Sequence, residues 1–511
     1  MASQGPASAL ERAYPVLRWV PADASYVAVT ARVSEGVLAA RELAGLASIG
    51  TGMNAAELDA WLRSALGASP IEAADLAAAG IDLDGSAALF GQDGTPTVAL
   101  PVADADQLGE LLARQEAAVI EHRGHQMRSR TDGELALSWV VVDGWLLLHL
   151  GPGGRERAWL DAVLAAPGAS MGADEELAAA VMRGRRALAG AGSDREVAPG
   201  LAGLVRLGPL ARDVATWPDA PDGLAACVRR AASHAPRLVW AADFSPQAGS
   251  VWAAVDLAPG AAGELRERIA GPPPPGYLAY RDAAALSLGW SVELAALERA
   301  REALSCPGLE QPLRDPVREA TGFRGPRGWH VAATSIDLDD MSGAGAVHLV
   351  LADRNLIAAQ LESIPARSLF ERTRRVAGLP VQVLSVPGLP TIMYRLAGER
   401  FTLAVGDGVM AEVLASEKGE ADRSGRPELA HARIQPQRLP QLGELLVAAL
   451  ASMGAPAARP TAAAIAERLS RYDEAALSAH MDGNSVAIFA RMRPRRSGHS
   501  LPTGLGRTSL W

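Results

Sequence analysis

The sequence predicts an α+β protein built of two tandem similar units, each a mainly antiparallel sheet with helices packed on one face. The main observation is that a series of strands, turns and helices in the first half returns in the same order in the second half. The second is composition, since a chain of 511 residues with 49% hydrophobic residues can bury one or two large cores. The third is a proline-rich segment between the two series.

Each predicted unit opens with an apolar strand, a helix and a hairpin, which is typical of an antiparallel meander. Each hairpin leads into a helix through a short phrase ending in Asp104 or Asp353, and either aspartate suits a helix N-cap. In the first unit the predicted strand is 25–33, the helix is 36–49, and the hairpin is 87–90 with 97–100. In the second unit the strand is 285–292, the helix is 293–304, and the hairpin is 330–336 with 347–351.

The later part of each unit is predicted as a hairpin, a helix, a short phrase, a second helix and a closing hairpin. Dipeptide turns such as Asp143-Gly144 mark the first of these hairpins. In the first unit these segments are, in order, 135–142 with 145–150, 155–166, 205–210, 227–234, and 237–244 with 251–257. In the second unit they are, in the same order, 390–396 with 400–405, 409–416, 432–437, 465–472, and 476–481 with 486–492.

Composition shifts predict the domain boundaries. Four consecutive prolines favour a stiff polyproline II spacer, because proline cannot join a sheet or continue a helix. We therefore expect a flexible segment at 1–19, a first unit at 20–270, a proline-rich linker at 271–280, a second unit at 281–495 and a flexible tail at 496–511. Our hypothesis is that the two units meet across a pseudo-twofold interface with a cleft between them.

Charge and hydropathy exclude several classes of function. A net charge of -9 argues against broad nucleic-acid binding, which needs clustered positive charge. No apolar stretch is long enough for a transmembrane helix. The first ten residues lack the pattern of a signal peptide, so the chain is either cytoplasmic or a mature form whose leader has been removed.

The rare residue types leave little room for special chemistry. Cys227 and Cys306 could pair if the units fold against each other, and the alternative that we favour is two buried free thiols. The single lysine, Lys418, lies in a polar loop, which nearly excludes Schiff-base catalysis. No glycine-rich phosphate-binding loop follows a predicted strand, so nucleotide binding has no support.

Residues 168–172 match the G-x-S-x-G pattern of serine hydrolases, with Ser170 at its centre. That motif needs a strand before the serine and a helix after it. Here helices are predicted on both sides, so the segment is interpreted as a helix–helix loop. A serine hydrolase using Ser170 is retained only as an unlikely alternative.

Neither the histidines nor the acidic phrases of the sequence match the ligand pattern of a metal site. His122 and His125 are too few for zinc and are expected in an exposed turn. His330, His348 and His480 lie on apolar predicted strands and are expected to be half-buried. The phrases at 82–85 and 337–340 lack the ligand spacing of a calcium loop and are better explained as turns.

Six tryptophans lie on or beside predicted strands. Tryptophan at such positions most often fills a core. The alternative is an apolar groove between sheet and helices that accepts an acyl chain. The tryptophans are Trp139, Trp145, Trp240, Trp252, Trp290 and Trp329.

The phrase Pro21-Ala22-Asp23 before the first strand, the phrase Gly80-Ile81-Asp82 and the turn Asp143-Gly144 resemble a group of uncharacterised duplicated exported proteins of Gram-negative bacteria. The resemblance covers most of the chain through short, degenerate motifs. It implies an α+β fold and a location in the periplasm or cell envelope. It implies no activity and no catalytic residue.

The sequence thus predicts a non-enzymatic binding or scaffolding protein of the bacterial cell envelope. The first alternative is a carrier of a lipid or another apolar ligand. No catalytic, cofactor-binding or metal-ligating residue is assigned, and no cofactor. The expected partner is a protein or an apolar small molecule, without nucleic acid and without an integral membrane span.

Overall fold

The fold is described from a computed structural model, which divides into two compact units. Unit 1 runs up to Asp256, and unit 2 runs from Leu257 to Arg496. Among the described residues, no helix has the length and apolar character needed to cross a membrane. The described residues are 8–39, 63, 69, 72–92, 95–190, 199–216, 222–245, 248–306, 326–337, 342–363, 371–385, 390–406, 408–415, 427–439, 441–452 and 458–495.

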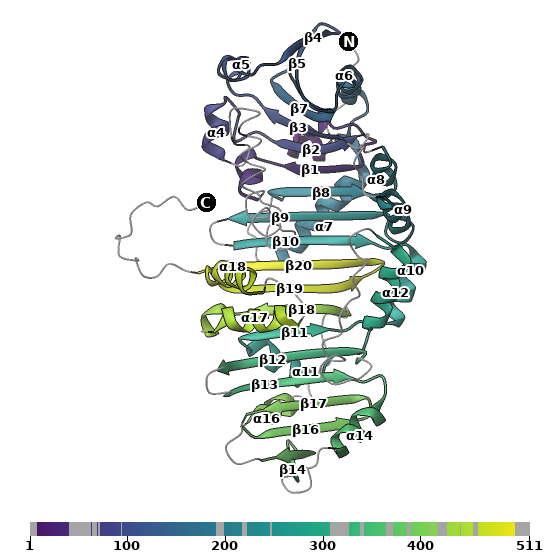
Figure 1. The fold of residues 1–511 in the computed structure, drawn as a ribbon, viewed down its shortest axis with the longest axis vertical. Helices are drawn as coiled ribbons and strands as arrows, with labels where there is room; N and C mark the ends of the chain where they lie inside the picture. Colours follow the sequence, from purple (N-terminus) through teal and green to yellow (C-terminus); the bar gives the residue numbers. More distant parts are fainter. Residues whose placement is uncertain are drawn as a thin grey trace, which may run out of the picture. The chain divides into compact units, whose positions relative to one another are not determined.

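Unit 1 contains an antiparallel sheet of ten described strands (Figure 1). Their order across the sheet is β4-β5-β6-β7-β3-β2-β1-β8-β9-β10. The strands are β1 (Tyr26–Thr30), β2 (Ala87–Gln92), β3 (Thr95–Pro101), β4 (Ala118–His122), β5 (His125–Asp132), β6 (Leu135–Val142), β7 (Trp145–Pro152), β8 (Leu201–Arg206), β9 (Arg237–Ser245) and β10 (Ala248–Asp256).

Helices cover both faces of the unit 1 sheet. On one face α7 packs so closely against β9 that a Cβ on Gly184 would lie 2.4 Å from Ala241 Cβ. On the opposite face Trp139 and Leu146 share a buried cluster with residues of α4 and α5. The helices are α1 (Ala9–Ala13), α4 (Ala73–Ala78), α5 (Ala105–Ala113), α6 (Glu156–Ala165), α7 (Glu175–Gly190), α8 (Leu207–Val214) and α9 (Leu224–His234), with 3-10 turns η1 (Pro15–Trp19), η2 (Ala166–Gly168) and η3 (Met171–Ala173).

Unit 2 likewise contains ten described strands, each antiparallel to its neighbours. Their order is β14-β15-β16-β17-β13-β12-β11-β18-β19-β20. The strands are β11 (Leu286–Trp290), β12 (Gly328–Asp337), β13 (Ser342–Val350), β14 (Glu371–Val376), β15 (Leu379–Leu384), β16 (Ile392–Ala397), β17 (Arg400–Val405), β18 (Glu428–Ile434), β19 (Tyr472–Asp482) and β20 (Ser485–Pro494).

Unit 2 also has helices on both faces. Tyr277 and Tyr280 of α11 and Met410 of α16 pack on one face of the sheet. The other helices pack on the opposite face, near the two ends of the strands. The helices are α10 (Pro259–Glu267), α11 (Pro275–Ala283), α12 (Leu294–Leu304), α14 (Arg354–Ser363), α16 (Val409–Ala415), α17 (Leu442–Ser452) and α18 (Ala458–Ser470), with the 3-10 turn η4 (Pro436–Arg438).

The strand order of unit 2 is that of unit 1 with every strand number raised by ten. Backbone bonds at equivalent places agree as well. The Ser25 amide donates to Gly91 at 2.9 Å, and the Ala285 amide donates to Ala333 at 2.9 Å. The carbonyl groups of the same two residues, Ser25 and Ala285, accept from Arg206 and Gln435, both at 2.8 Å. These bonds give a residue-by-residue correspondence between the two sheets.

The sequence prediction of helices on one face only is wrong, because helices cover both faces of each sheet. The physical reason is visible in β6, whose residues are nearly all buried instead of alternating between buried and exposed. A strand that is buried on both faces is an almost continuous apolar run, and such a run does not reveal a single covered face.

Three boundaries also differ from the prediction. The N-terminal segment is not uniformly flexible, since α1 and η1 form there and Val16 and Leu17 are fully buried. The units divide after Asp256, and Pro275 opens helix α11 inside unit 2. Proline suits the first turn of a helix, where its missing N–H has no intrahelical partner. The predicted tail 496–511 and most of the helix at 36–49 lie outside the described residues.

Candidate functional site

Unit 2 contains a row of residues that pair directly across five neighbouring strands. His431 on β18 pairs with Gly289 on β11, and Gly289 pairs with His330 on β12. His330 then pairs with His348 on β13, and His348 pairs with Thr402 on β17. Directly paired residues point to the same face of a sheet. We call these five residues the histidine row.

Glycine at position 289 lets two imidazole rings approach each other. The rings of His330 and His431 are stacked, with centroids 5.5 Å apart and planes at 11°. A Cβ on Gly289 would lie 2.1 Å from His431 Cε1 and 2.3 Å from His330 Nδ1. Any larger side chain would therefore occupy the space that the rings use.

Each histidine of the row has one ring nitrogen near a polar partner. His330 Nε2 lies 3.4 Å from Ser291 Oγ, and His348 Nδ1 lies 3.0 Å from Thr402 Oγ1. His431 Nδ1 lies 3.3 Å from an Arg281 guanidinium nitrogen. Within the described residues the other ring nitrogen of each histidine is buried without a hydrogen-bond partner.

Helix α11 covers the row with an aromatic ring. The Tyr277 ring is 6.1 Å from the ring of His330 and 5.8 Å from that of His348. Its hydroxyl and that of Ser287 are also buried and have no partner among the described residues. Burial raises the pKa of the Tyr277 hydroxyl. The row is thus a closed polar cluster inside an apolar core.

One ion pair borders the cluster. Arg281 Nη1 of α11 lies 2.6 Å from Glu428 Oε2 of β18, and each side chain is less than one-fifth exposed. Burial would raise the pKa of Glu428, but the contact with His431 and the charge of Arg281 outweigh it and lower the pKa to about 2. Glu428 is therefore a carboxylate throughout the physiological pH range.

His330 and His348 are neutral at physiological pH. Burial, reinforced by the neighbouring His431 and His348, lowers the pKa of His330 to about 3. Burial and the charge of Arg400 lower the pKa of His348 to about 4. Both side chains are fully buried, so the sequence expectation of half-buried histidines is wrong for these two. His480 is half-buried, as expected.

The matching row of unit 1 is entirely apolar. The equivalent strand pairs β3–β7 and β13–β17 end on the residue pairs Pro101–Trp145 and Val350–Arg400. The pair Ala99–Leu147 therefore corresponds to His348–Thr402. Following the pairing across β2, β1 and β8 gives the remaining residues, and all five are buried. The sheet therefore packs without histidines at these positions. In the order of the histidine row, unit 1 has Ala202, Val29, Ala88, Ala99 and Leu147.

Unit 1 has a buried histidine of its own, at a different position and with partners on its ring. His149 Nδ1 lies 3.0 Å from Thr97 Oγ1, and the Trp159 indole N–H donates to the same oxygen at 3.1 Å. The Trp159 ring stacks on His149 at 4.7 Å. Burial lowers the pKa of His149 to about 4. This single imidazole lacks a histidine neighbour in the described residues.

The face opposite the histidine row carries a second row of paired residues, which is apolar. Leu288 lies near its middle and is 38% exposed, and Leu477, nearer its β20 end, is 42% exposed. Each member of the histidine row is next in sequence to a member of this apolar row. The unit 2 apolar row comprises Tyr394, Leu403, Val347, Val331, Leu288, Ala432, Leu477 and Ala490.

Unit 1 has an apolar row at the equivalent positions. Leu89 near its middle is 42% exposed, and the ring of Trp240 covers Gly203, where a Cβ would lie 2.2 Å from the indole. The unit 1 apolar row comprises Trp139, Leu148, Val98, Leu89, Ala28, Gly203, Trp240 and Ala253.

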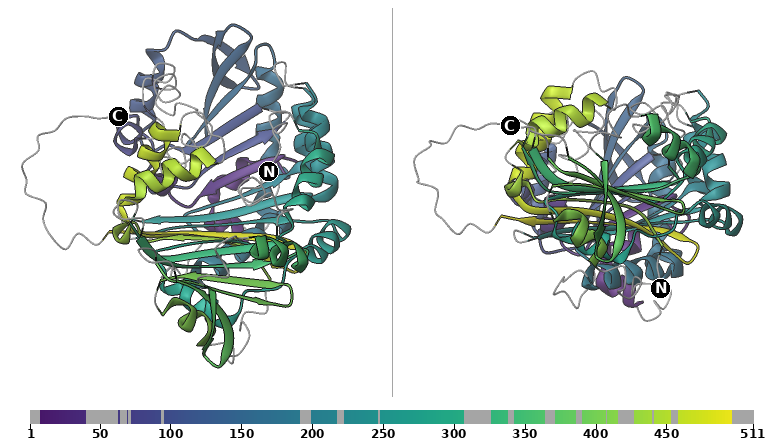
Figure 2. Two further views of the ribbon diagram at one scale, coloured as in Figure 1. Left: turned by 60° about the horizontal axis from the view of Figure 1, so that its bottom comes forward. Right: turned by 90° about the horizontal axis from the view of Figure 1, so that it is seen from below.

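Helices border the unit 2 apolar row at both ends of the strands. Leu442 of α17 packs beside Leu286 and Ile434 at one end. Ala262 of α10 packs beside Trp290 at the other end. Figure 2 (left) shows the yellow-green helices α17 and α18 standing on one side of the sheet. The exposed middle of the row lies between these two helical borders.

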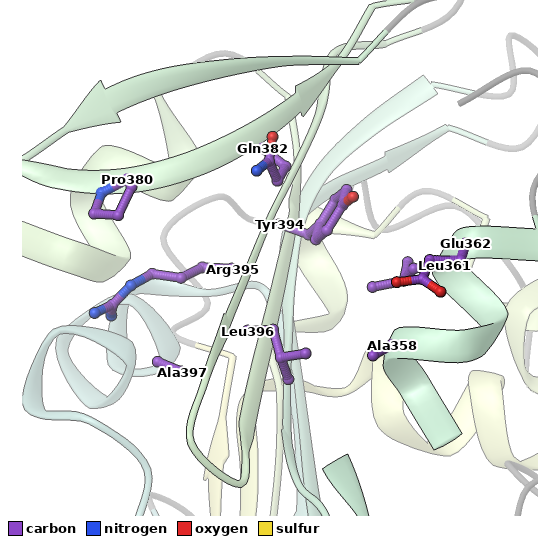
Figure 3. Close-up of a pocket in the computed structure, with 9 residues that line it drawn as sticks. All are labelled: Ala358, Leu361, Glu362, Pro380, Gln382, Tyr394, Arg395, Leu396 and Ala397. Carbon is purple, nitrogen blue, oxygen red and sulfur yellow. The ribbon is translucent and has the colours of Figure 1, made fainter. Parts of the chain in front are cut away.

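A hollow of about 330 Å³ lies beside the apolar row, between α14 and the β15–β16 hairpin. In Figure 3, Tyr394 and Leu396 extend toward the helix that carries Ala358 and Leu361, whereas Arg395 lies on the other side of its strand. The Tyr394 hydroxyl donates to Glu371, so the tyrosine is held in place as a wall of the hollow. The hollow thus adjoins the Tyr394 end of the apolar row, and its lining also includes the polar side chains of Glu362 and Gln382.

Ser170 lies in a loop between helices, which confirms the predicted helix–helix context of the G-x-S-x-G match. It lines a hollow of about 730 Å³ with acidic neighbours such as Asp174 and Glu175. Its Oγ accepts from the Gly172 amide at 3.3 Å and caps η3. Of the described residues that line this hollow, none is a histidine. The geometry is that of a structural cap.

We expect Ser170→Ala to lower stability by about 1 kcal/mol at most, the usual cost of losing a helix cap. Incubation of the folded wild-type protein with a fluorophosphonate probe is expected to give no labelling. Labelling that disappears in Ser170→Ala would contradict the structural interpretation.

The remaining candidate residues have structural roles. His122 and His125 flank a tight turn with positive φ at Arg123 and Gly124, and His122 Nε2 lies 2.6 Å from Asp161. The Asp84 amide donates to Asp82, as a turn requires. In the described part of the chain no group of three or more histidine, cysteine or acidic side chains is arranged to hold a metal ion. Lys418 and residues 338–340 lie outside the described residues.

Neither cysteine is a free thiol in the structure. Cys227 is buried on α9, and Cys306 follows α12. The interpretation of the two cysteines as buried free thiols is therefore wrong. Sequence reasoning had no means to decide this, because bonding depends on a distance that the sequence does not contain.

No family model and no curated protein matches the chain. Solved chains of TP0453 in crystal forms I, IV and III match with TM-scores of 0.25, 0.27 and 0.25 and identities of 8%, 10% and 8%. The matches cover 48%, 49% and 50% of this chain and 79%, 84% and 88% of the TP0453 chains. A likeness at this level supports no inference about function.

Proposed function

We propose that this protein is a non-enzymatic binding protein of the bacterial cell envelope, and that its apolar rows hold the acyl chain of a lipid or a similarly linear apolar ligand. The observation that carries the proposal is the pair of apolar rows, each unbroken across eight strands. Leucines in the middle of both rows keep about two-fifths of their surface exposed, at 38–42%.

The shape of the row favours an elongated ligand over a compact one. Strands lie about 4.8 Å apart, so a row that crosses eight strands extends for roughly 34 Å. It has no charged side chain along this length in unit 2. Burial of apolar surface contributes about 25 cal/mol per Å², and a chain of methylene groups fits such a track throughout its length.

Other observations support the non-enzymatic part and the location. The serine of the only hydrolase-like motif caps a turn, and the buried histidines lie inside the core. Bonded cysteines are typical of oxidising compartments such as the periplasm. We also infer that the two units descend from one duplicated module, which the matching strand order and backbone bonds support.

Leu288→Arg is expected to weaken binding of cis-parinaric acid, a fluorescent fatty acid, by at least about tenfold, because a buried apolar contact is replaced by a charge. The matched control is Met182→Arg on α7, which is 44% exposed but lies outside both rows. Native mass spectrometry of the gently purified wild-type protein should reveal a co-purifying lipid.

Absence of both lipid and probe binding would overturn the acyl-chain proposal. Equal loss of binding in Leu288→Arg and Met182→Arg would indicate a non-specific effect of the added charge. A protein that co-purifies in place of a lipid would favour the scaffolding alternative.

A further inference from the structure

The histidine row has no role in the proposed function, and unit 1 folds the same sheet without it. We propose that the histidine row makes unit 2 acid-sensitive, so that proton uptake below about pH 6 loosens β11, β12, β13 and β18 while the equivalent strands of unit 1 stay folded.

The geometry of the row gives an added proton no favourable place. The His330 ring is 5.5 Å from that of His431 and 6.4 Å from that of His348, so charge on one imidazole disfavours charge on the others. The other charged groups that face the row are Arg281 from α11, Arg400 from β17 and Glu428 from β18. Two of these three are cationic.

The only carboxylate among these groups is already paired. Glu428 lies 2.6 Å from Arg281, and its distance to the nearest nitrogen of His431 is 3.6 Å. Its charge favours a proton on His330, but burial and the neighbouring His431 and His348 outweigh it. A buried cation without a counter-ion is strongly destabilising.

The direction of the pH effect follows from linkage. Histidine in an unfolded chain has a pKa near 6.5, whereas the pKa values of His330 and His348 in the fold are about 3 and about 4. Above about pH 6.5 these two histidines are neutral in the folded and in the unfolded chain, so they do not make the free energy of unfolding depend on pH. Below it, the unfolded chain binds protons that the folded row refuses, so stability falls as the pH falls toward the folded pKa values.

The size of the effect differs between the units. At about pH 5 each refused proton multiplies the unfolding constant by about 30, so His330 and His348 together change it on the order of a thousandfold. Unit 1 has one such histidine, His149, whose pKa is about 4. The unfolding constant of unit 1 should therefore change by about 30-fold. Unit 2 should therefore lose protection first.

The test is hydrogen exchange of the full chain, measured by mass spectrometry at about pH 7.5 and about pH 5 and corrected for the intrinsic pH dependence of exchange. We expect peptides from β11, β12, β13 and β18 to lose on the order of a thousandfold in protection, and peptides from β1, β2, β3 and β8 about 30-fold. At about pH 5 the ionisation of Glu428 has not yet changed, because its pKa in the unfolded chain is about 4.3.

The control variant His330→Gln with His348→Gln keeps polar side chains and removes both titrating groups. Its unit 2 peptides are expected to lose less than about tenfold in protection over the same range, which isolates the histidines as the cause. If the variant does not fold, the comparison of units in the wild-type protein still decides the matter. Equal losses of protection in the two units of the wild-type protein would overturn the proposal.

Discussion

Arg281→Ala is expected to destabilise unit 2 by about 3–5 kcal/mol, because it leaves Glu428 as a mostly buried carboxylate without its cation. The two side chains are 17% and 16% exposed, and their closest atoms are 2.6 Å apart. Arg281→Lys keeps the charge but loses the planar guanidinium that contacts both Glu428 and His431, so an intermediate loss is expected.

The pH dependence of this variant provides a second readout. In the wild-type protein the pKa of Glu428 is about 2, below the value of about 4.3 in an unfolded chain. The carboxylate therefore contributes stability above about pH 4.3, and this contribution is lost as the pH falls toward 2. Without Arg281 the pKa of Glu428 should rise and the contribution should shrink.

Hydrogen exchange of the β11 and β18 peptides at pH 7 in increasing urea would measure the loss for unit 2 alone. A double-mutant cycle with Glu428→Gln isolates the pair. If Arg281→Ala cost as much in the Glu428→Gln background as in the wild-type protein, the ion pair would not be the source of the stability.

The sequence allowed prediction of the strands with an apolar pattern and a clear turn, such as β6 and β7 around Asp143-Gly144. It did not reveal the hairpins β4–β5 and β14–β15. The segments His125–Asp132 and Glu371–Val376 are rich in arginine and polar residues, and β14 is mostly exposed. Strands of this kind bury too little surface to leave an apolar alternation in the sequence.

The histidine row was recognised only in part. The sequence predicts His330 and His348 as strand histidines, but its pattern does not link them with His431 or Gly289. Their contact depends on β11 pairing with both β12 and β18, and residues 289 and 431 are far apart in the chain. The available signal was Gly289 itself, since an isolated glycine inside a strand indicates a close approach by another group.

Gly289→Val is expected to destabilise unit 2 by about 3 kcal/mol, although valine is the residue at the equivalent position of unit 1. A side chain at position 289 would meet His431 at 2.1 Å and His330 at 2.3 Å, and both rings are held by the surrounding core. Gly443→Ala on α17 is the matched control, because its Cβ would be 3.9 Å from the nearest atom, on Ala466.

The triple variant Gly289→Val with His330→Ala and His431→Ala gives unit 2 the residue types that unit 1 has at the equivalent positions. These unit 1 residues are Val29, Ala88 and Ala202. The two histidine changes alone should leave a cavity above Gly289 and cost about 2–5 kcal/mol. Because the valine fills that cavity, the triple variant should be more stable than the sum of its parts by about 3 kcal/mol. Hydrogen exchange of the β11 peptides would measure this coupling. Strict additivity would mean that position 289 of unit 2 and position 29 of unit 1 are not equivalent packing sites.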